Sequence, residues 1–105
     1  MQNQFRIPDV LIRVRLLLPE EGGRKTNIDG TTVDYGCPVH IDNLYFDCRF
    51  IGNAKKVFTL GEWHNIYIKF LSPELALPHF IIGKPLSLWE GKTIAEGFVK
   101  KLMIN

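Results

Sequence analysis

The sequence predicts an all-β fold, either a small antiparallel barrel or a sandwich. Apolar and polar residues alternate with a period of two in three runs of the chain. Turn-forming residues recur at short intervals between these and several shorter apolar runs, as is typical of small all-β domains. We treat residues 1–105 as one domain, and the 46% hydrophobic and 23% charged residues disfavour disordered and fibrous classes.

Each of the three alternating runs has one apolar and one polar side. They span residues 10–18, 44–50 and 66–70. We expect the apolar side to face the interior, because a strand presents alternate residues to opposite faces. The expected interior residues are Val10, Ile12, Val14, Leu16, Leu44, Phe46, Phe50, Ile66, Ile68 and Phe70. The expected outward residues include Arg13, Arg15, Tyr45, Arg49 and Tyr67.

Shorter apolar runs predict further strands. These are residues 39–41, 80–82 and 86–89, and the first is followed by the turn pair Asp42-Asn43. In the last segment, residues 92–103, the apolar spacing suits a helix. Gly97 in its middle disfavours a helix by about 1 kcal/mol relative to alanine and is more typical of a strand bend or bulge. The residues alone leave both possibilities open.

Three segments resemble, in the same order, the third, carboxy-terminal β-barrel domain of elongation factor Tu. The segment EEGGRKT (20–26) is similar to E-G-G-R-H-T of that family, and LGEWHNIYIKFLSP (60–73) is similar to its P-G-D-N and the alternating strand that follows. LSLWEGKTIAEGFVKKLM (86–103) resembles its final hairpin. The resemblance covers about residues 8–103. It implies a six-stranded antiparallel barrel, a bacterial origin, and a strand at 92–103 with an irregularity at Gly97, but no GTP chemistry.

The resemblance also implies a set of RNA-binding candidates. The family segment that matches the first motif touches the T-stem backbone of aminoacyl-tRNA, and an arginine, a lysine and a hydroxyl are suited to phosphate contact. The candidates are Arg24, Lys25, Thr26 and Lys92. The surrounding loop is nevertheless net negative, because it also holds Glu20, Glu21, Asp29 and Asp34. A polyanion would therefore gain little from this loop through counterion release.

No motif predicts a catalytic, cofactor or metal site. Gly91-Lys92-Thr93 resembles the end of a phosphate-binding loop, but that motif needs glycine where the chain has Leu86, and Glu90-Gly91 reads better as a hairpin turn. The cysteines and histidines lack metal-binding spacing; they are Cys37, Cys48, His40, His64 and His79. Cys37 and His40 would face opposite sides of a strand, which excludes a nucleophile pair. We expect Cys48 in the core.

The cysteine pattern and the absence of a signal sequence predict a reduced, cytoplasmic protein. The two cysteines lack CxxC spacing, and the chain begins MQNQFRIPD without a charged start and an apolar stretch. The longest apolar run is only a few residues, whereas about 20 are needed to span a bilayer. We therefore expect no membrane segment.

Two functions compete, with catalysis and ligand binding inside the barrel as weaker alternatives. The first is a non-enzymatic protein-binding module, such as an adaptor, a decoy or an immunity-type protein, with a partner of unknown identity. Its interface candidates are Arg13, Arg15, Tyr45, Arg49 and Tyr67, because arginine and aromatics are enriched at interfaces. The alternative is binding of tRNA or another RNA. We expect Trp63 and Trp89 to pack the barrel, and residues 19–36 to form a surface loop that serves a protein partner.

Overall fold

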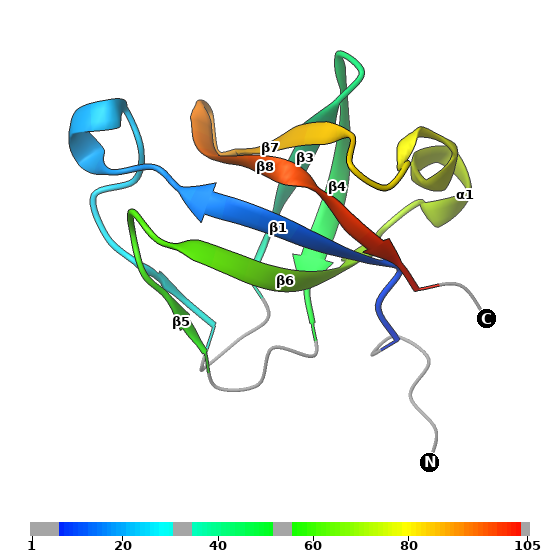
Figure 1. Cartoon of the computed structure of the whole chain (residues 1–105), viewed down its shortest axis with the longest axis horizontal. Coiled ribbons are helices and arrows are strands. Elements are labelled where there is room, and N and C mark those ends of the chain that lie inside the picture. Colours follow the sequence, from blue (N-terminus) through cyan, green and yellow to red (C-terminus); the bar gives the residue numbers. More distant parts are fainter. Residues whose placement is uncertain (1–6, 31–34, 52–55, 104–105) are drawn as a thin grey trace.

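The fold is a closed antiparallel β-barrel, seen in a computed structural model that describes residues 7–30, 35–51 and 56–103 (Figure 1). Six strands close the barrel in the order β1-β6-β4-β3-β7-β8. Their bounds are β1 (Val10–Leu16), β3 (Gly36–Ile41), β4 (Leu44–Phe50), β6 (Trp63–Phe70), β7 (Pro85–Trp89) and β8 (Thr93–Leu102). The prediction of a six-stranded all-β barrel is confirmed.

The remaining elements are short and lie in the connections. Strands β2 (Ile28–Asp29) and β5 (Val57–Phe58) pair with each other in a separate two-stranded sheet. The helical elements are the 3-10 turns η2 (Pro19–Glu21) and η3 (Leu77–His79) and the single turn α1 (Pro73–Ala76). Within the described ranges, no helix is long and apolar enough to cross a membrane.

Strand β1 shows most clearly how the alternating pattern builds the barrel. It pairs with β6 along one edge and with β8 along the other. Ile12 and Val14 are fully buried, whereas Arg13 and Arg15 are partly exposed, as the alternation predicts. The same alternation buries Ile66 and Ile68 in β6. Cys48 is also fully buried in the core, as expected.

Leu44 corrects the predicted interior, and Phe46 corrects it in part. Leu44 is 43% exposed, and Phe46 packs against the core but is only partly buried. Both have the inward parity of β4, but β6 pairs with β4 only from Cys48 onward. The first residues of β4 therefore pair with β3 on one side but have no strand on the β6 side, and the β3–β4 hairpin extends past this part of the barrel wall (Figure 1).

The turn of the β3–β4 hairpin follows its sequence signal. Asp42 and Asn43 have positive φ angles of 53° and 61°, which is the conformation of a type I′ hairpin turn. The tip is held against the chain that precedes β7. Lys84 Nζ lies 2.5 Å from Asp42 Oδ2, and His79 Nδ1 lies 3.0 Å from the same oxygen. Two side chains of the segment before β7 therefore hold the turn in place.

Residues 80–82 do not form the predicted strand. Phe80 is buried and packs against Phe70, with ring centroids 4.7 Å apart. Ile81 and Ile82 are 60% and 62% exposed and belong to a turn, in which the Lys84 N–H donates to the Ile81 carbonyl oxygen at 2.9 Å. The prediction is wrong because this apolar run follows η3 directly, and a tight turn replaces pairing to a neighbouring strand.

Residues 92–103 form a strand as expected, but its irregularities do not lie at Gly97. The pairing shifts at Ile94 against β7 and at Lys100 against β1, where one extra residue of β8 is accommodated in each ladder. Gly97 is paired regularly with Val14 and Leu86. A Cβ at this position would lie 1.9 Å from the Arg13 carbonyl oxygen, so glycine is required by the close approach of β1.

Candidate functional site

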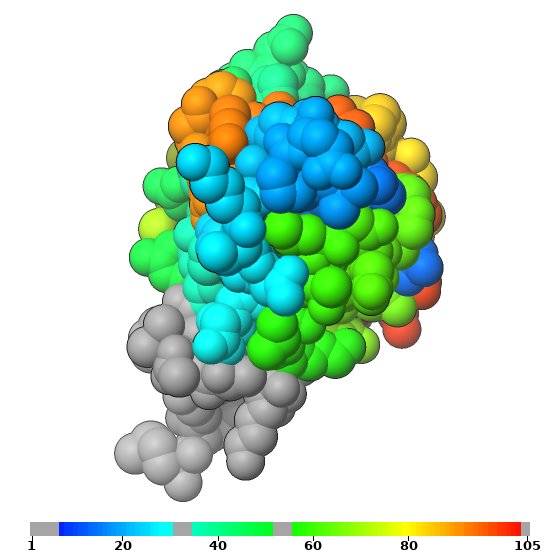
Figure 2. Space-filling view, turned by 90° about the vertical axis from the view of Figure 1, so that its left-hand side faces the viewer, coloured from blue at the N-terminus to red at the C-terminus, as the bar shows by residue number. Residues whose placement is uncertain are grey.

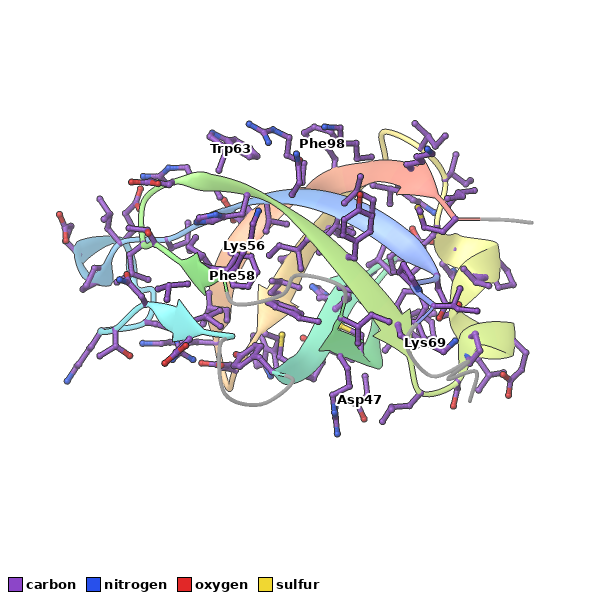
Figure 3. The ribbon with its side chains drawn as sticks, turned by 90° about the horizontal axis from the view of Figure 1, so that it is seen from below. Asp47, Lys56, Phe58, Trp63, Lys69 and Phe98 are labelled. Atoms are coloured by element: carbon purple, nitrogen blue, oxygen red, sulfur yellow. The ribbon has the colours of Figure 1, made fainter. Side chains whose placement is uncertain are left out.

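The outward face of β6, β1 and β8 brings aromatic and basic side chains together. Arg13 in β1 is paired with Asn65 in β6 on one side and with Phe98 in β8 on the other. Trp63 precedes Asn65 by two residues, so both belong to the outward side of β6, and Trp63 is 48% exposed. Figure 3 shows Trp63 and Phe98 projecting from the same side of the barrel, whereas Asp47 projects from the opposite side.

These side chains contact one another. Arg13 Nη1 donates to Asn65 Oδ1 at 2.9 Å, and its guanidinium carbon lies 5.7 Å from the centre of the Trp63 ring. The ring centres of Trp63 and Phe98 are 6.4 Å apart. Lys100 Nζ donates to the same Asn65 oxygen at 3.4 Å. We call this set the Trp63 surface; it comprises Arg13, Trp63, Asn65, Phe98 and Lys100.

A second aromatic surface lies on β4 and its neighbours. Tyr45 is 51% exposed and stacks on His40 of β3, with ring centres 4.4 Å apart and planes inclined by 17°. The edge of Trp89 lies against Tyr45 at 5.5 Å. Arg49 is exposed on the same strand, where its side chain covers Gly36 and its Nη1 donates to the Cys48 carbonyl oxygen at 3.3 Å.

The predicted interface residues therefore do not form one site. Tyr45 and Arg49 lie on β4, whereas Arg13 and Arg15 lie on β1. Tyr67 lies on β6 opposite Leu11 and is only partly exposed. Arg15 Nη1 contacts Glu21 Oε1 at 3.1 Å and so links β1 to η2.

The RNA-binding candidates meet at one end of the barrel, but their arginine is neutralised. In Figure 2, the segment in blue and cyan crosses this end between the orange tip of the β7–β8 hairpin and the green residues before β6. Arg24 Nη1 lies 2.5 Å from Glu90 Oε2 in that hairpin, and its guanidinium lies over the Tyr35 ring. Its Nε donates to the Thr26 carbonyl oxygen at 3.1 Å. Lys25, Thr26 and Lys92 are exposed.

The described part of the 19–36 segment is built into the fold instead of forming a simple surface loop. Glu21 accepts a hydrogen bond from the Leu18 N–H at 2.8 Å, and this bond, with Arg15, lowers the pKa of the Glu21 carboxyl below its ordinary value. Ile28 is fully buried. Asn27 Oδ1 accepts from the Leu60 N–H at 3.0 Å. The prediction of a surface loop is therefore wrong for Ile28, whereas Asn27 and Asp29 on either side of it are exposed. Residues 31–34, including Asp34, lie outside the described residues.

The cysteines face the interior. Cys37 and Cys48 are opposite each other in β3 and β4, and the Cys48 thiol donates to the Cys37 carbonyl oxygen at 3.2 Å. Burial raises the pKa of Cys37 to about 12 and raises that of Cys48 as well, which disfavours the reactive thiolate. Cys37 is buried while His40 faces outward, so they form no nucleophile pair.

The histidines serve structural contacts. His64 Nε2 lies 2.9 Å from the Thr59 carbonyl oxygen, and His79 contacts Asp42. Among residues 7–30, 35–51 and 56–103, no group of three or more potential ligands is placed to hold a metal ion.

A groove of about 490 Å³ opens where β3 and β7 diverge. These strands pair at only two positions, Val39 with Leu88 and His40 with Ser87. His40, Ser87 and Glu96 line the groove, yet no hydrogen bond joins these three side chains. An activated nucleophile needs an adjacent base within hydrogen-bond reach, and these three side chains form no such pair.

Sequence reasoning missed most of the Trp63 surface. Trp63 was expected to pack the barrel, but it lies outside, and Asn65, Phe98 and Lys100 were not candidates. The signal was present in part, because Trp63 has the same outward parity as Tyr67 in β6. Phe98 alternates with the buried Val99 in β8. No family model matches the sequence, and no curated protein matches it either.

Proposed function

We propose that the barrel is a protein-binding module whose interface is centred on the Trp63 surface. The observation that carries this proposal is the 48% exposure of Trp63 at the end of β6 that pairs with β1, a strand that is itself paired along both edges. Tryptophan, tyrosine and arginine dominate the binding energy of protein interfaces, and they act best when rigidly placed. An adaptor, a decoy and an immunity-type protein all use such a module.

The exposed part of Trp63 is large enough to act as an anchor. About half of a tryptophan's surface, on the order of 100 Å², is open to solvent. Burying that area at about 25 cal/mol per Å² gives about 2.5 kcal/mol, which reaches the range of an interface hot spot. Arg13 adds a cation beside the ring, and Phe98 extends the apolar area.

The electrostatics at the other end of the barrel support protein over RNA. Arg24, the best phosphate donor among the RNA candidates, contacts Glu90 and directs further N–H groups to the Thr26 carbonyl and hydroxyl oxygens. A phosphate would have to displace a carboxylate from Arg24. The exposed Lys25 and Lys92 stay available, and with the resemblance to the elongation factor Tu barrel they keep RNA binding as the second candidate.

The test is affinity capture from a cell lysate with and without nuclease. We expect the wild-type chain to retain a protein partner after nuclease treatment and Trp63→Ala to lose it. Tyr45→Ala is the matched control, since Tyr45 is 51% exposed and also stacks on a neighbouring ring. Thermal unfolding of each variant verifies that the barrel is intact.

The opposite result would replace this proposal with RNA binding. In that case nuclease abolishes capture, and wild-type protein binds tRNA at near-physiological salt. The double variant Arg24→Ala/Lys25→Ala then lowers the salt dependence of tRNA binding by about two units, because two phosphate contacts are lost. Capture that survives nuclease but is lost equally in Trp63→Ala and Tyr45→Ala would remove the Trp63 surface from its central role.

A further inference from the structure

Arg13 and Lys100 have no acidic partner among the described residues, whereas four other lysine and arginine side chains do. The ion pairs to carboxylates are Arg15 with Glu21, Arg24 with Glu90, Lys69 with Asp9, and Lys84 with Asp42. Arg13 and Lys100 instead donate to one neutral group, the amide oxygen of Asn65. In the part of the chain that the structure describes, neither contacts a carboxylate.

The shared oxygen holds two positive charges close together without neutralising them. Asn65 Oδ1 lies 2.9 Å from Arg13 Nη1 and 3.4 Å from Lys100 Nζ. Because an amide oxygen has two lone pairs, it can accept both bonds, but it carries no net charge. An arginine has five N–H donors, and Arg13 directs only one hydrogen bond to Asn65. An anion beside Arg13 would gain from both cations and from the remaining donors.

An apolar surface borders these cations. Trp63 lies against the Arg13 guanidinium, and Phe98 is the cross-strand neighbour of Arg13. Phe98 is in turn paired with Pro85, which is exposed in β7. A ligand that places an anionic group at Arg13 therefore meets apolar side chains directly beside it.

We infer that the Trp63 surface binds an acidic segment of a partner protein, in which a glutamate or aspartate has an apolar residue next to it. The carboxylate pairs with Arg13 and Lys100, and the apolar neighbour packs on Trp63 and Phe98. This inference rests on the proposed protein-binding function. It goes beyond that function by assigning the chemistry of the partner.

The position of Glu96 favours a protein carboxylate over a nucleic-acid backbone. Glu96 precedes Phe98 by two residues in β8, so it faces the same side, and it is exposed. Its cross-strand neighbour Arg15 contacts Glu21 instead. A continuous chain of phosphates along β8 would be repelled by Glu96, whereas a protein segment of mixed charge can avoid or use it.

The test uses the fluorescence of Trp63 in the Trp89→Phe background, where Trp63 is the single tryptophan. The probes are an acetylated and amidated hexapeptide of alternating glutamate and leucine, its glutamine counterpart, and octauridylate as a phosphate source. We expect the glutamate peptide to shift the emission of Trp63 and to bind about tenfold or more tightly than the glutamine peptide. Arg13→Gln should weaken binding by a similar factor, and Lys100→Gln should weaken it severalfold.

Lys92→Gln is the charge-matched control, because Lys92 is exposed just before the opposite end of β8 from Lys100. It should leave the affinity for the glutamate peptide unchanged. Equal binding of the two peptides, no binding up to millimolar concentration, or equal losses in Lys92→Gln and Lys100→Gln would overturn the inference. Tighter binding of octauridylate through Arg13 would overturn it in favour of phosphate.

The capture experiment separates this inference from the proposed function. A captured partner that depends on Trp63 but binds equally well to Arg13→Gln would contradict the acidic segment and leave the protein-binding function in place. Conversely, peptide binding that is weakened by Arg13→Gln and by Lys100→Gln supports the recognition chemistry even where lysate capture contradicts the proposed function.

Discussion

Replacement of Gly97 by alanine tests how closely β1 and β8 approach. The added Cβ would lie 1.9 Å from the Arg13 carbonyl oxygen and 2.6 Å from the Val14 Cα. Both are backbone atoms of a strand that is paired along both edges, so neither can move without disturbing two ladders. Overpacking of this kind costs typically 1–3 kcal/mol, and the severity of the overlap places Gly97→Ala at about 3 kcal/mol or more.

The effect is large for a domain of this size. Small domains unfold with about 5–15 kcal/mol, and each kcal/mol corresponds to about 4–8 °C, so we expect the midpoint of thermal unfolding to fall by about 12 °C or more. Gly83→Ala is the control, because Gly83 has a φ of +90° but a Cβ there would meet nothing within 4 Å. It should cost only about 1–2 kcal/mol of left-handed backbone strain. A smaller loss of unfolding free energy for Gly97→Ala than for Gly83→Ala would refute the steric argument.

Three further predictions concern the core, the hairpin tip and the thiols. Ile68→Ala should lower the free energy of unfolding in urea titrations by about 2–5 kcal/mol, because Ile68 is fully buried. Phe46→Ala should lower it by less, because Phe46 is only partly buried, and equal losses would contradict this. Lys84 and His79 lower the pKa of Asp42 in the folded state, so its contribution is present above the unfolded value of 3.8 and is lost as pH falls through the folded value. The urea midpoint of Asp42→Asn should thus lie below that of the wild type at pH 7, and the two midpoints should converge as pH falls through the folded pKa of Asp42, below 3.8. A difference that is independent of pH would exclude this origin. Cys37 and Cys48 should react with a thiol reagent only after unfolding, and rapid reaction of the native protein would contradict their burial.

The barrel was predictable because its main signal is local. Alternation in β1 and β6 needs only neighbouring residues, and it identifies Ile12 and Ile68 as interior whatever the strand order. Leu44 shares the same parity in β4, but its exposure depends on where β6 stops pairing with β4. No pattern within residues 44–50 contains that information.

The charges at the candidate sites were not predictable for a related reason. Arg24 loses its value for phosphate binding because Glu90, which is 66 positions away in the chain, pairs with it. Arg13 keeps its charge uncompensated because Asn65, 52 positions away, offers an amide instead of a carboxylate. Counting acids and bases in the 19–36 segment gives a net charge but not these pairings. The prediction that Trp63 packs the barrel was wrong because it relied on the preference of tryptophan for packed interiors and not on the outward position of Trp63 in the alternation of β6.

The two functional hypotheses can therefore be tested independently. The RNA candidates Lys25 and Lys92 lie near the Arg24–Glu90 contact, whereas the Trp63 surface lies on β6, β1 and β8. The two sets share no residue, and no described contact joins them. Effects of mutations at such independent sites add, so a Trp63→Ala/Lys92→Gln variant should lose protein capture by the amount seen for Trp63→Ala alone. A larger loss would mean that one partner spans both surfaces and that the barrel end contributes to protein binding.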